Sequence, residues 1–143
     1  MPTNAVVDAS VLVSAFLFPH SVPGDVIAWA REELYQLYLS PILIEEVRRS
    51  LMNARLKDAY GYGEDAVLAW CNELEALGKM VEELPTIPPI CRDPDDDHVI
   101  TAAVAAQVTF IVTGDKDLLE LSHYEGIRIL TARAFVDAIA NLS

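Results

Sequence analysis

The sequence RDPDDDHVITAAVAAQVTFIVTGD, residues 92–115, joins a cluster of acids to a long apolar run. Four aspartates fall within residues 93–97, directly before the apolar residues that extend to Val112. Carboxylates this close repel one another, so a folded protein keeps such a group as a helix start, a solvated turn or a cation site. Aspartate and proline are also ordinary turn and capping residues, so this stretch alone leaves all three interpretations open.

The apolar part of the stretch predicts a helix followed by a buried strand. The helix is expected to begin at Asp95 or Asp96 and to continue through Ala106, with apolar residues almost all round it. Residues 108–112 are apolar except for Thr109, as in a buried strand, and two small turn residues then lead to Asp115. An aspartate therefore follows the carboxyl end of a core strand.

The beginning of the chain repeats this arrangement. Residues 5–7 form a short apolar strand that ends at Asp8, and a helix is expected over residues 11–18. Ligands of open parallel α/β sheets bind at the carboxyl ends of the strands. Asp8 is therefore expected where chemistry would take place. A capping role at the following helix is an alternative, and the two roles are compatible.

Strand and helix patterns alternate along the rest of the chain. Further helices are expected over residues 25–34, from the Ser40 cap to about Leu56, over residues 64–77, after Asp115 and after the Thr131 cap, and further strands over residues 35–39, 80–84 and 127–130. This alternation predicts a three-layer α/β/α sandwich with a mostly parallel central sheet. The length of 143 residues fits a single domain, residues 1–143.

Glu46 lies one position away from the apolar face of its helix. At about 100° per residue, its side chain leaves the helix at the rim of the buried face and can point across the end of the sheet. Pairing with Arg48 or Arg49 on the same helix is the more ordinary alternative.

Three acids are expected to converge at one edge of the sheet. Asp8 and Asp115 follow strands, Asp97 lies in the first turn of a helix, and Glu46 can reach the same edge. Together these carboxylates would raise one another's pKa steeply unless a cation neutralised them. Carboxylate oxygens favour Mg²⁺ or Mn²⁺, which can activate water and stabilise the charge that develops during phosphodiester hydrolysis.

The composition limits the other function classes. The formal net charge of −12 argues against a broad electropositive surface for duplex DNA, so a nucleic-acid role requires divalent cations or a local group of basic residues. The two cysteines lack the spacing of a zinc site. No charged segment followed by an apolar one opens the chain, and its longest apolar run is too short for a bilayer, so a cytoplasmic location without a membrane partner is expected.

Four segments, taken in order, resemble the PIN-domain family of metal-dependent ribonucleases. They are VVDASVLVS at 6–14, SPILIEEV at 40–47, DPDDDHVI at 93–100 and VTGDKDLL at 112–119. The resemblance implies the PIN fold, an Mg²⁺- or Mn²⁺-dependent endoribonuclease activity and an RNA substrate. It also implies a toxin of a toxin–antitoxin pair, with an antitoxin protein as partner and a homodimer as assembly.

The resemblance assigns the site residues one by one. Asp8, Glu46, Asp97 and Asp115 match the family's four acids, Asp117 is a further metal ligand, and Thr113 has a supporting role. Many relatives have asparagine where this chain has Ser10, which keeps a hydrogen-bonding oxygen but lacks the amide donor. The candidate RNA contacts are Arg48, Arg49, Arg92 and Lys116.

Two other functions are compatible with parts of this pattern. One is a catalytically silent PIN-like module that binds RNA or a protein. The other is a phosphatase of the haloacid dehalogenase type, which Ser10 disfavours because that family has a second aspartate at this position. Within the acidic cluster, Asp93, Asp95 and Asp96 are expected to be turn and capping residues. The neighbouring His98 is expected to make a structural hydrogen bond.

Overall fold

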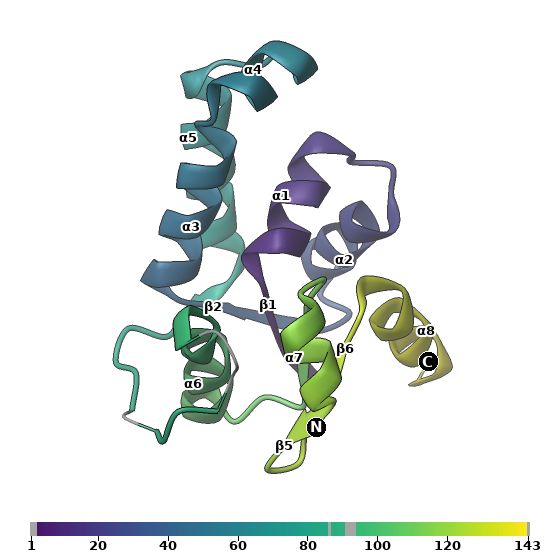
Figure 1. Ribbon diagram of the computed structural model, residues 1–143. Coiled ribbons are helices and arrows are strands. Elements are labelled where there is room, and N and C mark those ends of the chain that lie inside the picture. The colour runs from purple at the N-terminus through teal and green to yellow at the C-terminus, as the bar shows by residue number, and fades with distance from the viewer. Residues whose placement is uncertain (1–2, 86, 91–93, 143) are drawn as a thin grey trace.

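The computed structural model describes residues 3–85, 87–90 and 94–142. Its centre is a six-stranded sheet with the order β3-β2-β1-β4-β6-β5, and Figure 1 shows helices on both sides of it. The strands are β1 (Asn4–Val7), β2 (Gln36–Leu39), β3 (Lys79–Met80), β4 (Phe110–Val112), β5 (His123–Tyr124) and β6 (Ile127–Leu130). All neighbouring strands are parallel except β5 and β6.

The helices form two layers. The bounds are α1 (Ala9–Leu17), α2 (Val22–Arg31), α3 (Pro41–Leu51), α4 (Ala54–Tyr60), α5 (Glu64–Leu77), the 3₁₀ turn η1 (Pro94–Asp96), α6 (Asp97–Ala106), α7 (Lys116–Leu121) and α8 (Ala132–Leu142). Helices α5, α3, α1, α2 and α8 pack side by side in that order, whereas α6 lies against β1 and β4 from the other face. Right-handed crossovers produce this division, because the chain moves in opposite directions across the sheet before and after β3. The predicted α/β/α sandwich is confirmed.

The strand order changes direction at the centre of the sheet, beside β1. From β1 the chain proceeds outward to β2 and β3, and it then returns to β4 on the other side of β1. The loops after β1 and β4 therefore lead to opposite faces of the sheet, and in open α/β sheets ligands bind at the carboxyl edge beside such a point. The backbone N–H of Asp8 donates to the carbonyl of Val112 over 2.8 Å, which holds the ends of the two strands together.

The central strands are buried in the core. Residues 5–7 of β1 and Ile111 and Val112 of β4 are fully buried. Behind them, the ring of Phe135 from α8 packs edge-on against Tyr35 and Phe110. The site at the carboxyl edge thus stands on a closely packed core.

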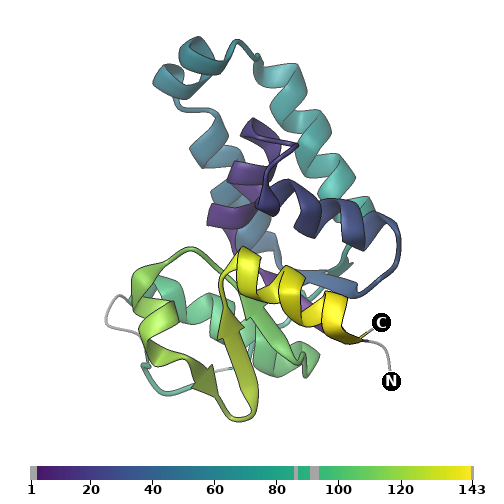
Figure 2. The same cartoon turned by 90° about the vertical axis from the view of Figure 1, so that its right-hand side faces the viewer.

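Several boundaries differ from the predictions. The helix expected to reach Leu56 ends at Leu51, because Asn53 accepts hydrogen bonds from two backbone N–H groups and starts α4 separately. Helix α4 and the adjoining end of α5 project from the body of the molecule in both views (Figures 1 and 2). The strand expected over residues 80–84 is only the two-residue β3, and the antiparallel β5 was not predicted.

Within the described residues, no single helix is long and apolar enough to cross a membrane. Helices α1 and α2 have the length and hydropathy of a membrane span only when they are taken together, and the chain bends by 97° at the break between them.

Candidate functional site

Asp8 is the most deeply buried acid of the site, with 8% of its surface exposed. It caps α1 through Oδ1, which accepts from the N–H of Ala9 over 2.8 Å, and its Oδ2 accepts from the Thr113 hydroxyl over 2.7 Å. Burial raises the pKa of Asp8, and the charge of Asp115 adds to this, while the two hydrogen bonds and His98 act in the opposite direction. The capping and functional interpretations of Asp8 are thus structurally compatible.

Thr113 joins Asp8 to the turn after β4. Its hydroxyl is fully buried, donates to Asp8 and accepts from the backbone N–H of Asp115 over 3.0 Å. Asp115 in turn caps α7, accepting from Leu118 over 3.0 Å. Ser10 makes a second link between the start of α1 and the turn after β4, because its hydroxyl accepts from the N–H of Gly114 over 3.1 Å. Short polar side chains therefore fix Asp8 and Asp115 relative to each other.

We expect Thr113→Val to lower the free energy of unfolding by about 2 kcal/mol, because it removes a buried hydrogen bond to a charged group. Valine keeps the shape of threonine, so the loss of the hydroxyl dominates. Thr113→Ser retains the hydroxyl and serves as the matched control. Urea unfolding of the metal-free proteins measures the difference, and equal losses in both variants would contradict the role of the hydroxyl.

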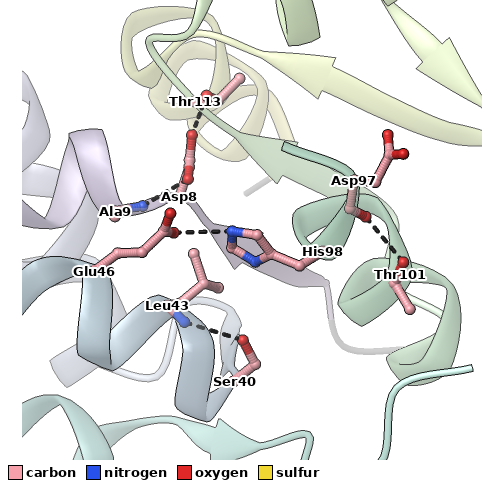
Figure 3. A network of polar contacts seen from close by, with 9 residues as sticks. All are labelled: Asp8, Ala9, Ser40, Leu43, Glu46, Asp97, His98, Thr101 and Thr113. Atoms are coloured by element: carbon pink, nitrogen blue, oxygen red, sulfur yellow. Dashed lines mark hydrogen bonds and ion pairs between the residues drawn. The ribbon is translucent and has the colours of Figure 1, made fainter. Parts of the chain in front are cut away.

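Glu46 reaches the same edge from α3. The buried Ser40 caps this helix by accepting from the N–H of Leu43 over 3.2 Å. Glu46 extends toward Asp8 and meets His98 of α6, with Oε1 of the carboxylate 2.9 Å from Nε2 of the ring (Figure 3). Burial and the charge of Asp8 raise the pKa of Glu46, whereas His98 and Arg49 lower it. The expected structural hydrogen bond of His98 is present, and its partner is a candidate site residue.

The ordinary ion pairs of α3 belong to Glu45. Its carboxylate accepts two hydrogen bonds from the Arg48 guanidinium and lies 3.8 Å from Arg49. Arg48 pairs with Glu45 and holds the pKa of this exposed carboxyl below its usual range. Arg48 therefore pairs with Glu45 and not with Glu46.

A second group of acids lies around the start of α7. One carboxylate oxygen each from Asp96, Asp115 and Asp117 lies within 4.8 Å of the other two. Oxygens that share a hard cation, each about 2.0–2.6 Å from it, lie within about 5 Å of one another, so this donor set fits Mg²⁺ or Mn²⁺. Asp115 also interacts with Asp8 by charge and thereby connects the two groups of acids.

The structure treats the two adjacent aspartates of the acidic turn differently. Asp96 ends η1 and its side chain makes no capping hydrogen bond to α6, although the sequence predicted a capping role for it. The Asp97 carboxylate accepts from the N–H of Ile90 at 3.3 and 3.4 Å, and Figure 3 shows it apart from Asp8 and Glu46. The assignment of Asp97 as a ligand stays a prediction, and geometry adds Asp96 as a candidate.

Two of the predicted RNA contacts, Arg49 and Lys116, lie beside the acids of this edge. An open groove of about 700 Å³ adjoins the site, with Glu46, His98 and Arg49 among its lining residues. Lys116 is exposed directly after Asp115, whereas Arg48 is engaged by Glu45. Arg92 lies outside the described residues.

Comparisons with known proteins agree with this architecture. The family model of the PIN domain matches residues 4–117, about four fifths of the chain. An uncharacterised protein of Methanocaldococcus jannaschii is 28% identical over 118 residues, covering 82% of this chain and 74% of that protein. A similar fold is found in one chain of the crystal structure of VapBC2 from Rickettsia felis, in which VapBC2 is bound to a DNA fragment from its promoter. Its TM-score is 0.56 at 11% identity, over 89% of this chain and 97% of that one.

The matched region, residues 4–117, contains all the acids of the site, from Asp8 to Asp117. PIN domains are generally nucleases and typically depend on divalent metal ions. The chain belongs to the PIN-domain family.

Proposed function

We propose that this PIN domain is an Mg²⁺- or Mn²⁺-dependent endoribonuclease that hydrolyses RNA phosphodiester bonds. The observation that carries the proposal is the meeting of acids from α3, the β1 end, the end of η1 and the β4 end at one edge of the sheet. Such a set of oxygen donors is costly without a cation and well suited to one.

The candidate ligands are Asp8, Glu46, Asp96, Asp115 and Asp117, with Asp97 as the sequence-based alternative to Asp96. When bound, the metal would supply a Lewis acid for the scissile phosphate and would lower the pKa of water at neutral pH. The candidate ligands all donate carboxylate oxygens. Zinc sites generally include histidine or cysteine ligands, so this donor set favours Mg²⁺ or Mn²⁺ over zinc.

The chain's own residues arrange this site. Thr113 fixes one oxygen of Asp8 and the backbone of Asp115, and Ser10 fixes the turn between them. Arg49 and Lys116 are proposed to contact RNA phosphates, because both are exposed beside the acids. Arg48 and Arg92 complete the set of candidate contacts. With a net charge of −12, phosphate binding depends on these few cations and on the metal.

We further propose that the chain is the toxin of a toxin–antitoxin pair in the cytoplasm, with an antitoxin protein as partner and a homodimer as its assembly. Membership of the PIN-domain family and the fold shared with a chain of VapBC2, a toxin–antitoxin complex, support this proposal. The likeness to that structure is one of fold alone at 11% identity.

Incubation of the purified protein with end-labelled single-stranded RNA tests the nuclease proposal. We expect internal cleavage with Mg²⁺ or Mn²⁺ and none with EDTA. A single-stranded DNA of the same sequence shows whether the 2′-hydroxyl is needed. RNA that is bound but left intact under varied metal conditions would instead favour the catalytically silent module.

A further inference from the structure

We propose that His98 is a positioning residue that holds the Glu46 carboxylate toward Asp8, so that the metal-binding edge is assembled before the cation arrives. This inference rests on the proposed function. It adds to the acids a residue that contributes through hydrogen bonding and is itself no metal ligand.

The contact joins two elements that the sequence separates widely. His98 lies in the first turn of α6, Glu46 lies in α3, and Nε2 of the ring is 2.9 Å from Oε1 of the carboxylate. The His98 side chain is only 13% exposed, against 38% for Glu46. The ring is therefore held in place by packing, and the more exposed carboxylate is oriented by it.

The second ring nitrogen narrows the possible roles of His98. Nδ1 is buried and has no hydrogen-bond partner among the described residues. A neutral ring protonated on Nε2 leaves Nδ1 as an unpaired acceptor and uses its one N–H for Glu46. Because Nε2 is directed at Glu46 and Nδ1 is enclosed, the ring presents no nitrogen of its own to a substrate. Figure 3 shows the ring between α6 and the carboxylate, close to Asp8.

Glu46 needs such a partner because its other neighbours draw it away from the site. The negative charge of Asp8 repels the Glu46 carboxylate, and the positive charge of Arg49, on the same helix, attracts it. Arg49 is exposed and lies three residues further along α3, which is within reach of a glutamate side chain. Without His98, we expect Glu46 to turn toward Arg49 and to leave Asp8.

Calorimetric titration of Mn²⁺ into the whole protein tests this role without using catalysis. We expect His98→Leu to weaken Mn²⁺ binding by about 10-fold or more, as replacements of residues that orient metal ligands generally do. His98→Gln can place an amide N–H where Nε2 lies, and should bind Mn²⁺ within about 3-fold of the unchanged protein. His20→Leu makes the same substitution at an exposed turn between α1 and α2 and should bind as the unchanged protein does.

The outcomes separate this inference from the proposed function. Weak binding in His98→Leu that is restored in His98→Gln, whatever the two melting temperatures, supports positioning. If the unchanged protein binds Mn²⁺ and His98→Leu binds it equally well, or if both variants lose affinity alike, the positioning role is overturned and the nuclease proposal stands. If the unchanged protein binds no Mn²⁺, the proposed function and this inference fall together.

Discussion

Replacing Asp8 with asparagine is expected to reduce RNA cleavage by at least about 100-fold while leaving the fold intact. A metal ligand contributes several kcal/mol of transition-state stabilisation, and each 1.36 kcal/mol is a factor of ten in rate. Asparagine has the same shape, and its carbonyl oxygen can still accept from Ala9 or Thr113. The variant therefore removes the negative charge with little other change.

The stability of this variant should change in the opposite direction. Burial raises the pKa of Asp8 in the folded protein, so the folded state binds a proton more tightly than the unfolded chain. Without metal, the stability of the unchanged protein therefore falls as pH rises from the ordinary pKa of an aspartate to the raised one. Asparagine does not ionise, so Asp8→Asn should gain stability relative to the unchanged protein between acidic and neutral pH.

Cleavage rates and urea unfolding at acidic and neutral pH measure the two effects. The control is Asp58→Asn, which replaces an exposed aspartate of α4 and should change neither the cleavage rate nor the stability. A variant at Asp8 that cleaves RNA at the unchanged rate would contradict the assignment of this residue. If Asp8→Asn loses activity and its urea unfolding is no longer cooperative, the residue has a structural role instead.

Asp96→Asn is expected to reduce cleavage by at least about 100-fold, and Asp97→Asn much less. The two residues are adjacent and chemically identical, which makes each the control for the other. The carboxylate of Asp96 lies with those of Asp115 and Asp117, whereas that of Asp97 faces the backbone of Ile90. Geometry therefore predicts a large difference between two almost identical substitutions.

Cleavage rates at saturating Mn²⁺, with circular dichroism to check folding, distinguish the two aspartates. The reverse order, with Asp97→Asn the more damaging, would support the assignment made from sequence and would contradict the one made from geometry. The same comparison at Asp115 should show a loss as large as at Asp96, because Asp115 belongs to both groups of acids.

The fold could be predicted from the sequence because its signals are local. The apolar runs before Asp8 and Asp115 define β1 and β4, and Ser40 marks the start of α3. Parallel strands then require the two aspartates to share an edge. The rim position of Glu46 also follows from helical periodicity alone, and its contact with α6 agrees with that expectation.

The choice between Asp96 and Asp97 could not be made in this way. It depends on where η1 gives way to α6, because a 3₁₀ turn advances about 120° per residue and an α-helix about 100°. The sequence allowed a helix start at Asp95 or Asp96, and the α-helix begins at Asp97. The hydrogen-bond partner of His98 could not be predicted for a different reason. The contact with Glu46 joins α3 and α6, and no local sequence pattern encodes it.

Calorimetric titration of Mn²⁺ into the unchanged protein and into Asp115→Asn tests the central claim, that acids at the carboxyl edge of the sheet bind a catalytic cation. The account predicts measurable binding by the unchanged protein and a loss of most of that affinity in the variant, because Asp115 connects the two groups of acids. Absence of binding by the unchanged protein near millimolar Mn²⁺, or equal binding by both proteins, would contradict it.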